Sequence, residues 1–175
     1  MNYPQEIKGT LVTLHILQPQ HFEKYHAMMS ATVRQALGLP SEAPFENTCD
    51  FLANEITECA QLGHLFYVIF DAASNKLIGA IKIRAAGSKE ALDRGMVGSW
   101  LNENYWGGGR YLQALGLAVT AFFAATHCPE ITAYVATTNQ RSLRAHQKYG
   151  FEIIGRHKQA CCDNKEVYVL ALRKK

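Results

Sequence analysis

The sequence predicts a single α/β (α+β) domain, in which a mixed, mostly antiparallel sheet of six to seven strands is flanked by about four helices. Three observations predict it. The chain has 175 residues, enough for one sizeable core and too few for two ordinary domains. With 48% hydrophobic and 19% charged residues, its composition is that of a globular protein. Runs with strand and helix periodicity follow one another in an order typical of a layered sheet.

The N-terminal third predicts one strand and two helices. Residues 7–17 alternate apolar and polar side chains, as a half-buried strand does. Pro19 then opens a helix, since proline is favoured in the first helical turn. Glycine and proline punctuate a loop over residues 38–46. Asn47 or Thr48 is expected to cap a second helix, which should end near residue 62 with Phe51 in the core.

The remaining two thirds predict six further strands and two longer helices. The strands are expected at 64–71, 77–84, 95–101, 130–135, 151–160 and 166–172, and the helices at 110–127 and 139–149. The sequence Ala-Ala-Ser-Asn joins the first two of these strands and is typical of a hairpin turn. No internal repeat, low-complexity segment or linker interrupts the chain, so residues 1–175 are expected to form one domain.

Charge and cysteine usage exclude several function classes. The formal net charge of +3 is a mild basic bias, well short of a typical nucleic-acid-binding surface. The five cysteines form no C-x-x-C pair, and adjacent Cys161 and Cys162 cannot readily share a metal or a disulfide. No apolar run approaches the length of a membrane span, and residues 1–6 do not resemble a signal peptide. A cytoplasmic protein without metal, membrane or nucleic-acid partners is expected.

The most informative segment joins a strand that ends at Leu101 to the long helix that begins near Arg110. Between them lie Trp106 and three consecutive glycines, Gly107 to Gly109. Glycines allow a sharp turn with exposed backbone N–H groups, and the helix start adds unpaired donors and the positive end of its dipole. Such a turn favours a diphosphate. It is not a Walker motif, and Leu112 occupies the position where a dinucleotide fingerprint requires glycine.

A second motif follows about thirty residues later, around the last predicted helix. It comprises Asn139, Ser142, Lys148, Gly150 and Phe151. Together the two motifs resemble those of GNAT superfamily N-acetyltransferases, in particular the ribosomal-protein-alanine acetyltransferase (RimJ/RimL-type) branch. That branch reads W-G-x-G after its fourth strand and N-x-x-S-x-x-x-x-x-K-x-G-F around its last helix. The resemblance extends over most of the chain, although residues 18–62 match only in general layout.

The resemblance implies a fold, a cosubstrate and a set of binding residues. Residues 95–151 would hold acetyl-CoA where the sheet splays open, and residues 18–62 would form the acceptor side. The backbone amides expected to cradle the pyrophosphate are those of Gly107, Gly108, Gly109, Arg110 and Tyr111. The strand ending at Leu101 would pair with the pantetheine arm, and Asn139 and Ser142 would lie at the thiol end. Lys148, with Arg141 and Arg144, would lie near the phosphates of the adenine side, or form a solvated basic face.

Departures from the family pattern fall on catalytic positions. Met96 stands where relatives often carry a glutamate base, and a thioether cannot take a proton. Ser99 could orient a water. His146 stands where several relatives have a tyrosine, so it could transfer a proton or could simply pack. Tyr111, which replaces a small residue, and Tyr149 are alternative acids. The candidate catalytic residues are His146, Ser142 and Ser99.

The acceptor is less constrained than the cosubstrate. The expected acceptor side is acidic, with Glu42, Glu46, Asp50, Glu55 and Glu58 and no lysine or arginine over residues 41–60. This is either a wall that attracts a cationic amine or a solvated helix face. The leading interpretation is acetylation of a protein or peptide N-terminal amine. A polyamine, aminosugar or antibiotic amine is the alternative within the enzyme class, and a non-catalytic acyl-CoA-binding sensor is the alternative outside it. Relatives are commonly dimers, so a homodimer is a further possibility.

Overall fold

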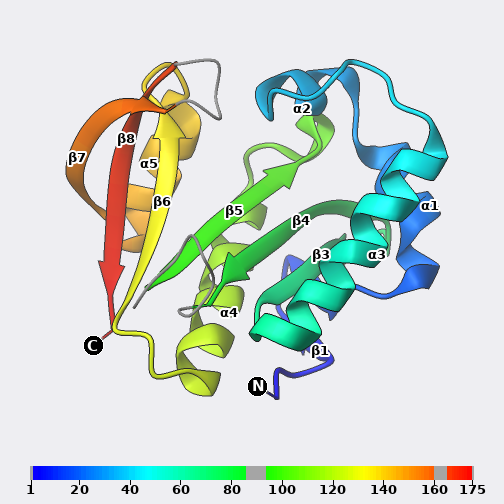
Figure 1. Ribbon diagram of the computed structural model, residues 1–175, viewed down its shortest axis with the longest axis horizontal. Coiled ribbons are helices and arrows are strands. Elements are labelled where there is room, and N and C mark those ends of the chain that lie inside the picture. The colour runs from blue at the N-terminus through cyan, green and yellow to red at the C-terminus, as the bar shows by residue number, and fades with distance from the viewer. Residues whose placement is uncertain (1, 86–93, 160–164, 175) are drawn as a thin grey trace.

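The computed structural model describes residues 2–85, 94–159 and 165–174, which form one eight-stranded sheet flanked by helices (Figure 1). Its strands lie in the order β1-β2-β3-β4-β5-β6-β8-β7. The strands are β1 (Glu6–Lys8), β2 (Val12–Ile16), β3 (Leu65–Asp71), β4 (Leu77–Arg84), β5 (Gly95–Leu101), β6 (Glu130–Ala136), β7 (Glu152–Gln159) and β8 (Lys165–Arg173). The helices are α1 (Phe22–Met28), α2 (Ala31–Ala36), α3 (Phe45–Leu62), α4 (Arg110–Ala125) and α5 (Gln140–Tyr149), with 3-10 turns η1 (Pro19–His21) and η2 (Glu103–Tyr105). The predicted mixed, mostly antiparallel α/β sheet is confirmed, because in the described ranges only β5 and β6 pair in parallel.

The first predicted strand, residues 7–17, is wrong as a single element. It is a hairpin of β1 and β2, closed by a hydrogen bond of 2.8 Å from Gly9 N–H to the carbonyl oxygen of Val12. The side chain of Gln113 on α4 stabilises this turn, since its Oε1 accepts from the backbone N–H groups of Leu11 at 2.7 Å and Val12 at 3.0 Å. Apolar alternation continues through the turn, so the pattern alone did not reveal it.

The helices before β3 also differ from expectation. A short helix, α2, was not predicted, although Ser30 caps it by accepting from the backbone N–H of Val33 at 3.2 Å. Helix α3 begins at residue 45, and Pro44 rather than Asn47 or Thr48 takes the N-cap position. Proline's fixed φ and missing N–H suit a helix start, which explains the earlier beginning.

Two hydrophobic layers cover the faces of the sheet. Strand β3 is buried along its whole length, and its side chains alternate between the layers. Tyr67 and Ile69 face the layer that includes Leu115 and Phe122 of α4. The opposite face contacts α1 and α3. In Figure 1, α4 lies behind the sheet and α1 and α3 lie in front of it.

The sheet splays between its two parallel strands, as expected. Strands β5 and β6 pair over only three positions, from Gly95 opposite Ile131 to Val97 opposite Ala133. Beyond these residues β5 keeps its partner β4, and β6 keeps its partner β8. The two strands diverge in Figure 1. Among the strands that the structure describes, none therefore pairs with the edge of β5 that faces β6 over residues 98–101.

The described ranges also bear on two sequence predictions, the absence of a membrane span and the residues around the C-terminal cysteines. Within them, no helix combines the length and the apolar character needed to cross a membrane. Cys161 and Cys162, and the last residue of the strand predicted at 151–160, lie outside the described residues.

Candidate active site

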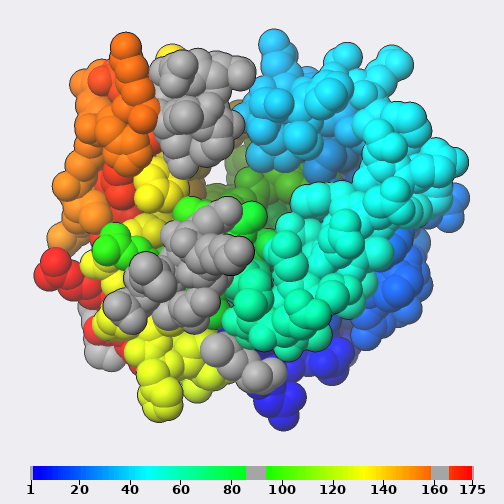
Figure 2. All heavy atoms as spheres, viewed as in Figure 1, coloured from blue at the N-terminus to red at the C-terminus, as the bar shows by residue number. Residues whose placement is uncertain are grey.

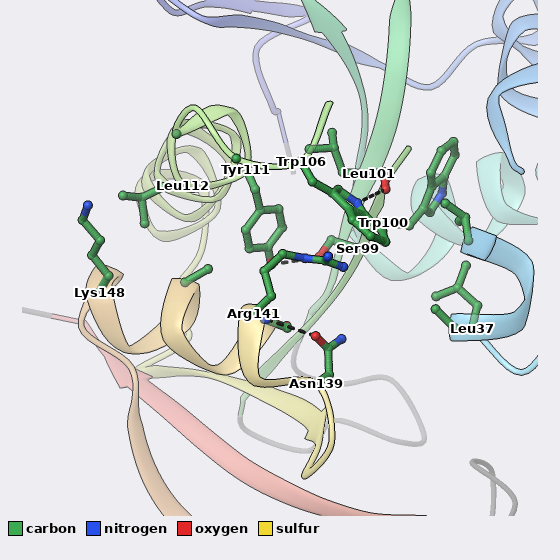
Figure 3. A pocket seen from close by; sticks show the side chains of 16 residues that line it. Leu37, Ser99, Trp100, Leu101, Trp106, Tyr111, Leu112, Asn139, Arg141 and Lys148 are labelled. Carbon is green, nitrogen blue, oxygen red and sulfur yellow. Dashed lines mark hydrogen bonds between the residues drawn. The ribbon is translucent and has the colours of Figure 1, made fainter. Parts of the chain in front are cut away.

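A cavity of about 310 Å³ occupies the space beside the splayed strands (Figure 3). Its wall combines the end of β5, the glycine turn, the first turn of α4, one face of α5 and the end of α2. The lining residues are Val33, Ala36, Leu37, Ser99, Trp100, Leu101, Trp106, Gly107, Gly109, Tyr111, Leu112, Asn139, Arg141, Ser142, Ala145 and Lys148. We call this the glycine-turn cavity. Residues predicted from two motifs far apart in sequence thus meet on one wall.

The glycine turn has a backbone conformation that excludes ordinary side chains. Gly107, Gly108 and Gly109 have φ of +82°, +61° and +82°, in the left-handed region. Gly109 is the N-cap of α4, so the first backbone N–H groups of that helix have no carbonyl partner within it. Unpaired donors and the positive end of the helix dipole converge here, a geometry that fits a diphosphate.

The side chain of Arg110 does not add a free charge to this turn. Its Nε donates to Oδ1 of Asp71 at 2.7 Å, and the Asp71 side chain is only 5% exposed. Asp71 also accepts from the backbone N–H and the hydroxyl of Ser74. The Arg110–Asp71 ion pair thus neutralises the charge of Arg110, and anion binding would rest mainly on backbone amides.

The Arg110–Asp71 pair predicts an acid-dependent stability. The hydrogen bond from Arg110, followed by that from Ser74, lowers the pKa of the Asp71 carboxyl. A carboxyl whose pKa is lower in the folded than in the unfolded chain stabilises the fold above the unfolded value. That stabilisation disappears as the pH falls from about 4 through the folded pKa. Asp71→Asn should therefore cost about 2 kcal/mol of unfolding free energy at pH 7, and progressively less below pH ~4. Urea denaturation across this range, with the exposed Asp50→Asn as a control, measures it. A cost that does not change with pH would contradict the assignment.

Trp106 and Arg141 close one side of the glycine-turn cavity. The indole Nε1 of Trp106 donates to the carbonyl oxygen of Leu101 at 2.7 Å. The guanidinium carbon of Arg141 lies 3.2 Å from the centroid of the Trp106 ring, and burial lowers the pKa of this guanidinium. Figure 3 shows Arg141 reaching from α5 towards Trp106. The carbonyl of Leu101 is therefore already occupied, and Arg141 stacks on an indole instead of extending along its helix.

The other residues predicted on α5 differ in whether they line the glycine-turn cavity. Asn139 caps the helix, since its Oδ1 accepts from the backbone N–H of Ser142 at 3.1 Å, and it also lines the cavity. Lys148 is exposed at the far end of the wall. Arg144 is exposed on the same helix and is not part of the wall.

Hydrogen bonds join the three predicted catalytic candidates into one chain, in which Tyr111 links Ser99 to His146 and His146 contacts Ser142. Oγ of Ser99 lies 2.9 Å from the hydroxyl oxygen of Tyr111, which lies 3.2 Å from Nε2 of His146. Nδ1 of His146 lies 2.8 Å from the backbone carbonyl oxygen of Ser142 and 3.4 Å from its hydroxyl. His146 is only 4% exposed, and burial lowers its pKa. Tyr111, assigned from sequence to the glycine turn through its amide, is thus the central member of the chain.

A second cavity, of about 410 Å³, opens on the opposite face of β5. Its aromatic side chains are Tyr25, Phe51, Phe66, Trp100 and Tyr134. We call it the aromatic cavity. It shares Leu37, Ser99 and Trp100 with the glycine-turn cavity, so the two spaces adjoin at Ser99. The space-filling view is hollowed between α2 and β6, over the green of β5 (Figure 2).

The aromatic cavity changes two expectations about the acceptor side. Phe51, expected in the core, is 49% exposed on the cavity wall, because α3 presents that face to the opening instead of to the sheet. Of the five acidic residues, only Glu55 lines the cavity, and it is paired with Lys82. The other four are exposed. Among the described residues, no three His, Cys, Asp or Glu side chains are grouped as a metal site would require.

A protein-family model matches most of this chain. Residues 12–152 match the family model of the acetyltransferase (GNAT) domain. Comparison with curated protein sequences finds no match.

Solved acetyltransferase structures resemble this fold over nearly their full length. RimL, a ribosomal L7/L12 alpha-N-protein acetyltransferase solved with coenzyme A, has a TM-score of 0.83 at 22% identity, covering 96% of this chain and 97% of that one. The ribosomal-protein-S5-alanine acetyltransferase from Vibrio fischeri has a TM-score of 0.81 at 15% identity, covering 96% of each chain. The microcin C7 self-immunity acetyltransferase MccE, solved with acetyl-CoA and AMP, has a TM-score of 0.84 at 14% identity, covering 98% and 97%. At these identities the similarity establishes the fold.

Proposed function

Because the family match spans most of its length, this chain belongs to the GNAT acetyltransferase family and is an N-acetyltransferase, and we propose that it transfers the acetyl group of acetyl-CoA to a primary amine. One observation carries this proposal. The turn of three left-handed glycines and the part of β5 that has no strand partner beside it line one cavity, which adjoins a second cavity at Ser99. A long, diphosphate-bearing thioester fits the first of these cavities, and an amine fits the second.

The residues would divide the work between these two cavities. The amides of Gly107 to Tyr111 would bind the diphosphate, and the free edge of β5 near Ser99 would hold the amide-rich pantetheine arm. Acetyl-CoA supplies an activated carbonyl as a thioester. The wall of the glycine-turn cavity would orient that carbonyl towards Ser99 and the aromatic cavity. Holding both reactants at one point supplies much of the rate acceleration of such a transfer.

We favour the terminal amine of a protein or peptide as the acceptor. Two of the structurally similar enzymes are named as acetyltransferases of ribosomal proteins, which supports this choice. The aromatic cavity supports it too, because the one carboxylate among its described lining residues, Glu55, is paired with Lys82 and attracts a polycation weakly. A polyamine, aminosugar or antibiotic amine is the second candidate, favoured by the exposed acidic residues of α3 nearby. The two adjoining cavities favour catalysis over a non-catalytic sensor, which needs only the first.

A thiol-release assay with acetyl-CoA tests the proposal. The panel contains peptides with free and with blocked N-termini, spermidine and an aminoglycoside. We expect release of free thiol with peptides whose N-terminus is free and none with their blocked counterparts. Faster release with spermidine or the aminoglycoside would overturn the peptide assignment. No release with any amine, from protein that binds acetyl-CoA, would favour the sensor.

A further inference from the structure

We propose that Ser99, Tyr111 and His146 form a proton relay, in which His146 accepts the proton of the acceptor amine through the two hydroxyl groups. The inference rests on the proposed acetyl transfer and names the base of that reaction. Another base is needed because Met96, the residue at the expected base position, carries a thioether that cannot take a proton. Among the described residues that line the two cavities, the carboxylate is Glu55. It is already paired with Lys82 and is therefore not a free base.

The contact between His146 and the backbone of Ser142 fixes the donor and the acceptor of each hydrogen bond in the relay. The backbone carbonyl oxygen of Ser142 can only accept, so Nδ1 of His146 carries the proton in that 2.8 Å contact. In a neutral imidazole the other nitrogen, Nε2, is then an acceptor. The hydroxyl of Tyr111 therefore donates to Nε2 of His146, and its oxygen is left to accept from Ser99. The lone pairs of Ser99 Oγ remain for a donor outside the chain.

Ser99 is the member that can meet that donor. It is half-buried on β5 and lines both the glycine-turn cavity and the aromatic cavity. Figure 3 shows the ring of Tyr111 directed from α4 towards Ser99 on β5. An amine that enters from the aromatic cavity reaches Ser99 at the boundary of the two spaces. Ser99 is thus placed to touch the reacting nitrogen, while Tyr111 and His146 act through it.

The relay balances the protons of the transfer. As the amine nitrogen bonds to the acetyl carbon and the carbon–sulfur bond breaks, the amine proton passes to Ser99. The proton of Ser99 passes to Tyr111, and that of Tyr111 to Nε2 of His146. Each hydroxyl ends with one proton, His146 becomes an imidazolium, and the thiolate takes the electron pair of the broken bond. The imidazolium returns its proton by the same route to the thiolate sulfur.

The surroundings of His146 suit this role. Within the described part of the chain, its ring contacts Tyr111 from α4, Ser142 on its own helix, and the edge-on ring of Phe151 just before β7, whose centroid lies 5.1 Å away. Of these, Tyr111 is the titratable one, and burial raises its pKa to about 12, so it stays a protonated hydroxyl. Burial lowers the pKa of His146, which keeps the imidazole neutral, and able to accept a proton, at neutral pH.

Nuclear magnetic resonance of the ligand-free protein tests the relay without any turnover. Long-range proton–nitrogen spectra of the histidine rings report the tautomer, and the His146→Gln variant identifies the His146 signals. We expect a neutral ring protonated on Nδ1 at pH 7, with the Nε2 signal shifting in Tyr111→Phe. A ring protonated on Nε2, or charged at pH 7, would overturn the relay.

Kinetics supply the second test. Tyr111→Phe and Ser99→Ala should each lower kcat by about a hundredfold or more, with the KM for acetyl-CoA within about threefold of wild type. In wild type kcat should fall with decreasing pH as His146 is protonated, at a pH below the ordinary histidine value of about 6.5, and His146→Gln should lose this acid limb. Tyr67→Phe is the matched control, because it removes the hydroxyl of a buried β3 tyrosine that donates to the carbonyl oxygen of Pro4. Its kcat should not change.

The outcomes separate the relay from the proposed function. Wild-type turnover with kcat of Tyr111→Phe within threefold would refute the relay and leave the acetyltransferase assignment standing. An acid limb that persists unchanged in His146→Gln would refute it as well. If wild type turned over no amine at all, the proposed function would fail, and the ring tautomer would still decide the hydrogen-bond direction on which the relay depends.

Discussion

Gly109→Glu is expected to lower the affinity for acetyl-CoA by about a thousandfold. Gly109 has φ +82° at the N-cap of α4, so any side chain is strained there. A carboxylate at this position would also lie beside the expected diphosphate. Two like charges about 4 Å apart near a protein surface repel by about 4 kcal/mol, which corresponds to about three orders of magnitude in affinity. Calorimetric titration with acetyl-CoA measures the loss.

Gly109→Gln is the matched control for this prediction. It adds a side chain of the same size and imposes the same backbone strain, without the charge. We expect both variants to bind acetyl-CoA more weakly than wild type, with the smaller loss of affinity in the glutamine variant. A glutamate variant that binds as wild type does would show that the diphosphate lies elsewhere.

Gly79→Ala is expected to destabilise the fold by about 3 kcal/mol. Gly79 lies on β4 opposite Leu101, and a Cβ there would come within 2.4 Å of the carbonyl oxygen of Trp100 and 3.1 Å of the Cα of Leu101. Both obstacles are backbone, so one strand has to move away from the other. Overpacking of this kind typically costs about 1–3 kcal/mol, and rigid backbone puts this case at the upper end. Urea denaturation measures the change.

Gly98→Ala provides the comparison on the neighbouring strand. A Cβ at Gly98 meets nothing within 4 Å. This variant should lose no stability, since glycine within a strand is itself unfavourable by about 0.5–1 kcal/mol relative to alanine. Equal stability of the two variants would mean that β4 and β5 are not as closely apposed as the fold has them.

Local patterns predicted most of the fold. Strands from β3 onwards have period-2 apolar runs or turn residues at their ends, and their predicted bounds lie within one residue or so of those observed. The splay between β5 and β6 followed from family resemblance and not from periodicity. Two local features were missed although their signals are in the sequence. Ser30 is a suitable cap for α2, and Gly9 marks the turn between β1 and β2.

Contacts between distant residues could not be predicted from local pattern. Arg110 and Asp71 are 39 positions apart, and Tyr111 and His146 are 35 apart. No periodicity links such pairs, since only the packing of α4 against β3 and α5 brings them together. The sequence placed Ser99, Ser142 and His146 in one candidate set, but the connection through Tyr111 required the fold. The aromatic cavity depends likewise on how α3 crosses the sheet.

A crystal structure of the protein grown with coenzyme A tests most directly whether the splayed strands and the glycine turn form the acetyl-CoA site. We expect density for the diphosphate at the amides of Gly107 to Tyr111. We also expect the pantetheine arm along the free edge of β5, with its thiol next to Ser99. Coenzyme A bound on another face of the sheet, with the space between β5 and β6 filled by side chains, would contradict this assignment.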